Sequence, residues 1–328
     1  MFRRLTISTT CSLLILFGAI GVSIGFAKKH KSKKENPLPA AHAVLWRAPA
    51  DISQRDLLLG PGGESMKPDL RKVTLIEKEM GGYSKKYRVR DASGNEWIAK
   101  VGKEAQGETA ATRLVWGIGY FTDVNYLVPN VRIEGIKKPL KNVRFSARPK
   151  DIKRMDGFEW TNNPFIGTRE FQALKVLMAL LNNWDIKDSN NKILIVPTSN
   201  GQNELQYEVH DLGGTFGKIS HIPRFLQFRP DRNNPKAYAK SHLIDKVKDG
   251  QVRLHYSAKR GKLFKGISVA DAHWLGDLLS RLTQQQIEDA FRAANYTPDE
   301  VRLMSVAVRK RIAELVDLPA NSRVASRS

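Results

Sequence analysis

Three polar residues in two short strings have the types and the order that phosphoryl transfer requires. Asp185 and Asn190 lie in NWDIKDSN (183–190), and Asp211 lies further along in VHDLGG (209–214). Such a reaction needs one carboxylate near the acceptor hydroxyl, then an amide and a second carboxylate that hold Mg²⁺. The two strings therefore predict a magnesium-dependent phosphotransfer site.

The spacing within these strings sharpens the prediction. Asp185, Lys187 and Asn190 follow D-x-K-x-x-N, the pattern of a protein-kinase catalytic loop, and Asp-Leu-Gly stands in place of Asp-Phe-Gly. Either string alone has a structural explanation, because a tryptophan beside an amide pair suits a helix end and Asp-Leu-Gly-Gly suits a turn. Both strings together, at this separation, favour a kinase-like site in which Lys187 stabilises the transferring phosphate.

Residues nearer the N-terminus supply the expected nucleotide-binding side. Lys100 ends WIAK (97–100), the form of the strand lysine that holds the phosphates of ATP, and Ile98 is expected to face the adenine. Glu108 on the following helix is the predicted ion-pair partner of Lys100, and Glu104 is its competitor. The structural alternatives are a solvated lysine and an acid placed by the helix dipole.

A glycine pair precedes this lysine. Gly81 and Gly82 lie between the first two expected strands, where a kinase places the loop that covers the phosphates, and Ser84 and Lys85 can add donors there. The loop is not G-x-G-x-x-G, and two adjacent glycines often indicate only a turn. This part of the site is therefore the least specific.

In this order the motifs resemble those of the HipA-type kinases, an atypical branch of the protein-kinase-like superfamily, over residues 73–217. The resemblance implies that the protein binds ATP and phosphorylates serine or threonine hydroxyls. It implies that Asp185 orients the acceptor hydroxyl and takes its proton. It also implies that Asn190 and Asp211 bind Mg²⁺ and that Lys100 holds the α and β phosphates.

The catalytic string also departs from the family pattern. Ile186 replaces a residue that is often small or polar, Lys187 stands where histidine is frequent, and Trp184 replaces the usual arginine. The missing arginine implies no regulation through a phosphorylated activation loop. A catalytically inactive module with the same fold is therefore the main alternative to an active kinase.

The expected fold is α+β, a two-lobed protein-kinase-like architecture with an antiparallel-sheet small lobe and a mainly helical large lobe. Alternating apolar residues predict three strands up to WIAKV (97–101), then a helix over 108–117 and two strands near 131–133 and 143–145. Three strands, a helix and two strands, in that order, are typical of a kinase small lobe.

The large lobe is expected to begin with a helix over 171–181, which stops at the catalytic string. A hairpin over 193–209 then returns Asp211 to the side of Asn190. After a polar, irregular stretch over 218–266, three helices are expected over 269–282, 284–294 and 298–316, the last two with clear capping signals.

These elements divide the chain into five parts. The division is: 1–27, signal peptide or membrane anchor; 28–70, basic Pro/Gly-rich arm; 71–150, small lobe; 151–318, large lobe; 319–328, disordered tail. An apolar stretch over 11–26, followed by the small residues of a cleavage site, predicts a secreted or periplasmic protein. An uncleaved membrane anchor is the alternative. The single cysteine, Cys11, lies in this stretch, so a processed chain would form no disulfide.

The charge predicts polyanionic partners. The 328 residues include 54 Lys plus Arg against 33 Asp plus Glu, a formal net charge of +21. An anionic envelope polymer or an acidic membrane surface would respond to this field. Specific nucleic-acid binding is not expected, because the sequence lacks a zinc-finger spacing and an aromatic RNP string.

Other chemistries have weaker support. His210 precedes Asp211, but no second histidine stands at ligand spacing, so no zinc site is predicted. A serine hydrolase is unsupported because G-x-S-x-G is missing. Transfer of AMP stays open, since the same residues can hold the nucleotide reversed. Because ATP is scarce outside the cytoplasm, an exported kinase would work in a host, use another donor, or have become a binding protein.

Overall fold

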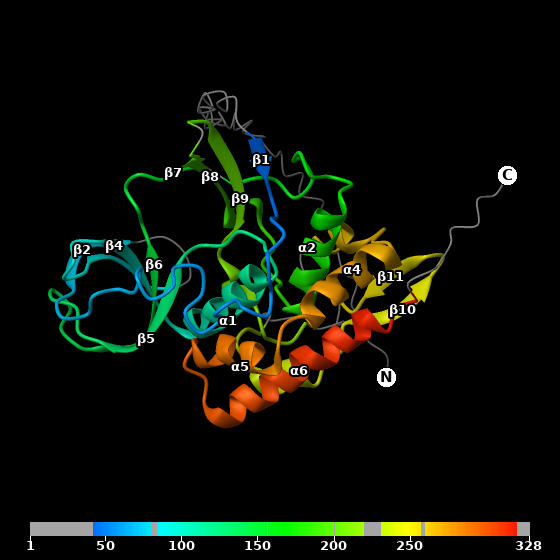
Figure 1. The fold of residues 1–328 in the computed structure, drawn as a ribbon. Helices are drawn as coiled ribbons and strands as arrows, with labels where there is room; N and C mark the ends of the chain where they lie inside the picture. The colour runs from blue at the N-terminus through cyan, green and yellow to red at the C-terminus, as the bar shows by residue number, and fades with distance from the viewer. Residues whose placement is uncertain are drawn as a thin grey trace, which may run out of the picture. The chain divides into compact units, whose positions relative to one another are not determined.

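The structure is a computed structural model that describes residues 42–79, 84–155, 157–199, 201–219, 231–256 and 260–319. All of these residues belong to one compact unit, Pro39–Ser328. Two hydrophobic clusters form separate cores within it, one on a five-stranded sheet and one among the helices and a four-stranded sheet (Figure 1). The predicted two-lobed α+β architecture is confirmed.

The small lobe has the predicted order of three strands, a helix and two strands. Its elements are β2 (Thr74–Glu79), β3 (Lys86–Arg90), β4 (Glu96–Val101), α1 (Lys103–Gly117), β5 (Asn125–Val131) and β6 (Leu140–Ala147). The strands pair antiparallel in the order β2-β3-β4-β6-β5. The prediction for the fourth strand was wrong, since β5 ends where it was expected to begin. Pro129 and Asn130 interrupt the apolar pattern of β5.

Strand β4 carries two kinds of residue on its two faces. Trp97 and Ala99 are buried in the small-lobe core, where Trp97 makes an edge contact with Phe145. Because side chains alternate along a strand, Ile98 and Lys100 lie on the opposite face. Ile98 therefore shares the face of Lys100, as the sequence predicted.

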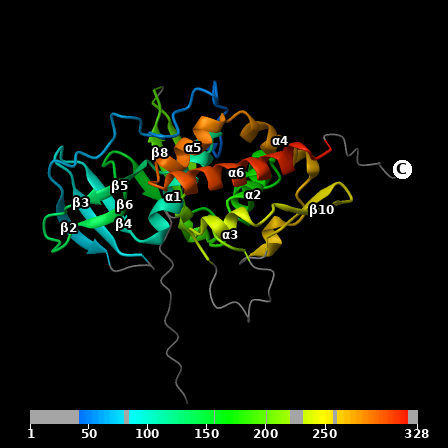
Figure 2. The same ribbon diagram turned by 90° about the horizontal axis from the view of Figure 1, so that it is seen from below.

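The large lobe is built on helices. They are α2 (Arg169–Leu180), α3 (Pro235–Ala239), α4 (Val269–Ser280), α5 (Gln284–Arg292) and α6 (Pro298–Val316). Helix α6 packs against α3, α4 and α5 (Figure 2). Thr283 with Gln286 and Thr297 with Glu300 form the two predicted capping boxes, which satisfy backbone donors at the starts of α5 and α6.

The predicted hairpin is present and belongs to a four-stranded sheet. Strands β8 (Asn191–Pro197) and β9 (Asn203–Val209) pair antiparallel, with β7 (Lys153–Met155) beside β8 and β1 (His42–Val44) parallel to β9. Short 3₁₀ helices flank the hairpin at Asp188–Asn190 and Leu212–Gly214. Asp211 thus follows the end of β9, as predicted.

Two segments that the sequence assigned to irregular chain contain secondary structure in their described parts. Within the expected arm, β1 pairs with β9, and three apolar residues lie in the large-lobe core: Leu45, Ile52 and Leu57. The stretch over 218–266 contains α3, the hairpin of β10 (Ile244–Lys248) and β11 (Gln251–Leu254), and a 3₁₀ turn at Gly261–Phe264. Few of these residues repeat at a fixed period, so the pattern did not reveal them.

Several predictions fall outside the described residues. These are the targeting segment over 1–27, the first part of the arm, the glycine pair at Gly81 and Gly82, and nearly all of the tail over 319–328. In the part of the chain that the structure describes, no helix has both the length and the apolar character needed to cross a membrane.

Candidate active site

Lys100 is the centre of the site. Its side chain is 2% exposed, and its Nζ lies 2.9 Å from Glu108 Oε2, 2.9 Å from Glu104 Oε2 and 2.8 Å from Asp211 Oδ1. Both glutamates that the sequence offered as partners therefore contact it. Lys100 also contacts Asp211, although 111 positions separate them in the chain.

The turn between β4 and α1 explains why both glutamates reach the lysine. Gly102 is the N-cap residue of α1 and has a φ of 118°, a conformation that favours glycine. The chain thus enters the helix directly after Lys100. Glu104 and Glu108 are one turn apart on the same helix face, so both carboxylates point back at the lysine that precedes them.

A second layer of buried charge lies behind Glu108. Arg144 on β6 places Nη2 3.1 Å from Glu108 Oε1 and Nη1 2.8 Å from Asp123 Oδ2. Asp123 also accepts hydrogen bonds from Ser146 Oγ and, at 3.1 Å, from Asn125 Nδ2. Positive and negative side chains therefore alternate in the order Lys100, Glu108, Arg144, Asp123. Each buried charge has a neighbour of opposite sign, which compensates the cost of removing it from water.

The charges set the protonation of this cluster. Burial alone would lower the pKa of Lys100, but the carboxylates of Glu108 and Asp211 outweigh it and raise that pKa. Burial acts to raise the pKa of Asp211, and the Lys100 ammonium overrides it and lowers the pKa to about 2. Lys100 is therefore an ammonium and Asp211 a carboxylate at neutral pH, the forms that bind phosphate and Mg²⁺.

Asp211 has an unusual backbone. Its φ of 49° and ψ of 57° lie in the left-handed region, which aspartate tolerates better than most residues. Its side chain is 36% exposed, and Lys100 is its one ion-pair partner among the described residues. The carboxylate is thus held at one oxygen and accessible to a ligand.

The two glycines after Leu212 allow close packing around Asp211. A Cβ on Gly213 would lie 2.9 Å from Glu104 Cβ. A Cβ on Gly214 would lie 3.0 Å from Asn183 Oδ1 and 3.1 Å from Asp185 Cβ. One glycine therefore permits contact with the lysine cluster, and the other permits contact with the catalytic loop.

The catalytic loop is held by its own amides. Asn190 Nδ2 donates to the Asp185 carbonyl oxygen at 2.8 Å, which closes the loop across the predicted D-x-K-x-x-N string. Asn183 Oδ1 accepts from the Asp185 backbone N–H at 3.2 Å. Lys187 Nζ lies 2.7 Å from Asp185 Oδ2, so the two predicted catalytic side chains are in contact.

The oxygen atoms of this site fit the proposed ligands. Asp185 Oδ1 is buried and lacks a hydrogen-bond partner in the part of the chain that the structure describes, so this carboxylate keeps one unsatisfied acceptor atom. The amide nitrogen of Asn190 is already engaged, which leaves its oxygen for a cation. Mg²⁺ prefers oxygen ligands such as this amide and the Asp211 carboxylate.

Sequence reasoning missed part of the site. Arg144 and Asp123 were not singled out, and neither was Arg232, which forms an ion pair with Glu104 and lies over the Trp184 ring. Ser84, expected near the phosphates, donates to Glu104 Oε2 at 2.6 Å and so belongs to the lysine cluster. Arg144 lies between Val143 and Phe145 in an apolar strand, and this charged residue was the available signal for a buried ion pair.

The element order and these contacts define a protein-kinase-like fold with its polar cluster where the two lobes meet. The sequence matches no protein-family model and no curated protein. Among solved structures the chain is similar to the Helicobacter pylori proinflammatory kinase CtkA, with 11% identity, a TM-score of 0.46 and coverage of 77% of this chain and 95% of that chain. It is also similar to the Rio2 kinase of Chaetomium thermophilum, solved as an ADP/Mg²⁺-phosphoaspartate complex, with 10% identity, a TM-score of 0.34 and coverage of 75% and 72%. Both likenesses are distant, so the assignment rests on the elements and contacts of the chain itself.

Proposed function

We propose that the protein is an ATP- and Mg²⁺-dependent phosphotransferase of the HipA-like type that transfers the γ-phosphate to a hydroxyl, with protein serine or threonine as the acceptor. One observation carries the proposal: the Lys100 ammonium lies within hydrogen-bond distance of both Glu108 and Asp211. In a protein kinase the ion pair between a strand lysine and a helix glutamate, and the metal-binding aspartate, must all be in place for catalysis.

Each residue then has a defined task. Lys100 binds the α and β phosphates and is held in place by Glu108. Asn190 and Asp211 supply the oxygen ligands for Mg²⁺, which when bound neutralises charge on the phosphate oxygens. Asp185 accepts the proton of the acceptor hydroxyl, and Lys187 lies beside it to stabilise negative charge on the transferred group.

Nucleotide binding and phosphate transfer can be tested separately. The full chain should gain thermal stability with ATP and Mg²⁺ together, and Asp211→Ala should abolish that gain because it removes a metal ligand. Asp185→Asn should keep the gain and lose transfer. The exposed Asp151 provides a control, since Asp151→Ala should change neither. Stability that is insensitive to nucleotide in the wild-type chain would contradict the proposal, and the mass of any modified product would distinguish phosphate from AMP.

A second candidate function follows from the charge. With a formal net charge of +21, the protein can bind an anionic envelope polymer or an acidic membrane surface without catalysis. Such binding should weaken as salt is raised and should survive Asp185→Asn and Asp211→Ala. Salt-independent binding would remove the basis for this function.

Export or membrane anchoring through residues 1–27 belongs to both proposals, and compartment fractionation tests it.

A further inference from the structure

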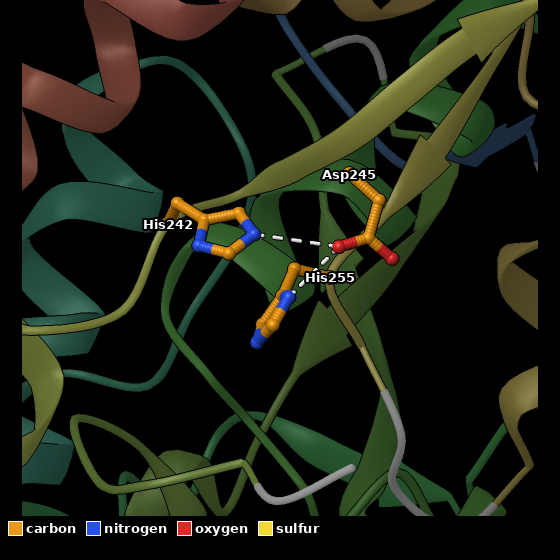
Figure 3. Close-up of side chains that lie close together, drawn as sticks. All are labelled: His242, Asp245 and His255. Atoms are coloured by element: carbon orange, nitrogen blue, oxygen red, sulfur yellow. Dashed lines mark hydrogen bonds and ion pairs between the residues drawn. The ribbon is translucent and has the colours of Figure 1, made fainter.

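Three side chains that commonly bind metals gather at one end of the β10–β11 hairpin. His242 precedes β10, Asp245 lies within it, and His255 directly follows β11. Asp245 Oδ1 is 3.3 Å from His242 Nε2 and 2.8 Å from His255 Nδ1 (Figure 3). The potential ligand atoms of all three residues lie within 4.8 Å of one another. The cluster is in the large lobe and shares no residue with the candidate active site.

The hairpin geometry explains why these residues meet. Ile244 pairs with Leu254 and Lys246 pairs with Arg253, so Asp245 is an extra residue in a β-bulge. A bulge redirects a side chain relative to the regular ladder. Because the strands are antiparallel, the residues before β10 and after β11 lie at the same end of the hairpin. The bulged Asp245 therefore meets a histidine from each strand end.

The turn that carries His242 is fixed by the helical core. Glu314 on α6 accepts hydrogen bonds from the backbone N–H groups of Leu243, at 2.8 Å, and Ile244, at 2.9 Å. The His255 N–H donates to the Leu243 carbonyl oxygen at 2.7 Å. Both histidines are thus attached to a positioned backbone, which lowers the entropy lost when a ligand orders them.

The donor set selects a class of metal ion. Two imidazole nitrogens and one carboxylate oxygen suit Zn²⁺ and related transition metals, whereas Mg²⁺ and Ca²⁺ prefer oxygen ligands alone. Bond lengths of about 2.0–2.1 Å to tetrahedral zinc place neighbouring ligand atoms about 3.3 Å apart. The 3.3 Å contact of Asp245 Oδ1 with His242 matches that spacing, and the 2.8 Å contact with His255 is a hydrogen bond that would lengthen when a metal binds.

We propose that His242, Asp245 and His255 form a binding site for one divalent transition-metal ion, with Zn²⁺ as the expected ion and water completing the coordination. Nothing in the phosphotransfer proposal requires this site. Arg253, whose Nε is 3.8 Å from Asp245 Oδ2, lies on the side of the carboxylate away from the histidine contacts and is placed to orient it.

The site is connected to the catalytic loop through the neighbours of its two histidines. Ser241, directly before His242, has its Oγ 3.3 Å from Asn182 Nδ2. Tyr256, directly after His255, donates its hydroxyl to the Asn183 carbonyl oxygen at 2.5 Å. A metal that joins His242 to His255 would therefore hold together the two segments that support Asn182 and Asn183, immediately before Asp185.

Cobalt binding tests the site with a signal that is independent of enzyme activity. Co²⁺ in a tetrahedral site with nitrogen and oxygen ligands gives visible absorption bands, and Zn²⁺ should displace it. We expect one Co²⁺ per untagged full-length chain, and at least a tenfold loss of affinity in His255→Ala and in Asp245→Asn. No saturable Co²⁺ binding by the wild-type chain, or equal binding by these variants, would overturn the proposal.

Two control variants make the result specific. His273 on α4 lies 3.2 Å from Asp277, and among the described residues this half-buried histidine and its exposed aspartate form no group of three metal-binding side chains, so His273→Ala should leave Co²⁺ binding unchanged. Asp211→Ala should also keep it, because that residue belongs to the active site. Loss of Co²⁺ binding in either control would overturn the assignment to the hairpin. Failure of the metal site would leave the ATP-binding test unaffected.

A thermal measurement guards against variants that fail to fold. Zn²⁺ should raise the melting temperature of the wild-type chain and of His273→Ala. Asp245→Asn keeps the size of the side chain and one acceptor oxygen for the histidine contacts, so without metal its melting temperature should be close to that of the wild type. It should not rise on adding Zn²⁺. An equal rise with Zn²⁺ in Asp245→Asn and the wild type would count against the site.

Discussion

The two ends of the candidate active site are held in different ways. At the small-lobe end, Lys100 is buried and contacts three carboxylates from two other segments of the chain. At the large-lobe end, Asp185 pairs with Lys187, whose side chain is 49% exposed, and its Oδ1 lacks a partner among the described residues. Under the proposed function, the lysine end is arranged in advance, whereas the aspartate end is completed by a substrate.

This difference has a chemical reason. A triphosphate presents the same charged groups in every reaction cycle, so a fixed cation suits it and needs little reorganisation. An acceptor hydroxyl varies in position and charge, and a carboxylate with one unsatisfied oxygen can respond to it. Loss of a side chain at the lysine end should therefore affect folding, and loss at the aspartate end should affect turnover.

Replacing Lys100 should have the largest effect on stability. Lys100→Met removes the cation between Glu104, Glu108 and Asp211 and leaves buried negative charge, which should cost about 3–5 kcal/mol of the free energy of unfolding. Urea denaturation measures this loss. The exposed Lys78 on β2 is a matched control, and Lys78→Met should change stability by less than about 0.5 kcal/mol. Similar losses in both variants would contradict the comparison.

Replacing Asp185 should reverse that pattern. Asp185→Asn keeps the shape of the side chain and the backbone contact with Asn190, so stability should change by less than about 1 kcal/mol. The proton acceptor is lost, so turnover should fall about 10²- to 10⁴-fold. Phosphate transfer and urea denaturation on the same preparation measure both effects. A large loss of stability would show that the two ends are held alike.

The adjacent glycines allow each end to be disturbed separately. Gly214→Ala places a Cβ against Asn183 and Asp185, and it should reduce turnover about 10²-fold while nucleotide affinity is kept. Gly213→Ala places a Cβ against Glu104, so it should weaken nucleotide binding and cost about 1–3 kcal/mol of stability. Binding and transfer assays on the pair test this. Indistinguishable effects of the two substitutions would argue against separate ends.

The residues of the catalytic loop were more predictable than the buried contacts behind Lys100. Asp185 and Asn190 stand in one string and close one loop by a direct hydrogen bond, so local spacing was sufficient to find them. Arg144 was missed because its role depends on contacts with α1 and Asp123, which are distant in sequence. In a chain with 54 Lys plus Arg, an arginine is ordinarily expected at the surface.

The hairpin of β10 and β11 was missed for another reason. Asp249 and Gly250, both with positive φ, form the turn between the two strands, and Asp-Gly is a strong hairpin signal. Strand β10 is largely exposed, and the apolar alternation of β11 covers only Val252 and Leu254, which is too short a run to support that signal. His242, Asp245 and His255 meet only because this hairpin forms, and their spacing in sequence matches no common zinc motif.

The smallest effect is expected from the titration of Glu208. A measurement of stability against pH tests whether the buried charges behind Lys100 include this carboxyl group. Burial, together with the nearby charge of Asp123, raises the pKa of Glu208 on β9 from 4.5 to about 8. Between these two values the folded chain holds a proton that the unfolded chain has released. The stabilising contribution is therefore complete below pH 4.5 and is lost as pH rises toward 8, at about 1 kcal/mol per pH unit.

The substitution Glu208→Gln removes the titrating group and keeps a neutral side chain of the same size. The wild-type chain should lose stability from pH 5 to pH 8 more steeply than Glu208→Gln, as measured by urea denaturation at each pH. At pH 8 the variant should be at least as stable as the wild type. Parallel profiles would mean that Glu208 is ionised in the folded chain at neutral pH. Glu208 on the four-stranded sheet would then carry a buried negative charge in addition to the one at Asp123.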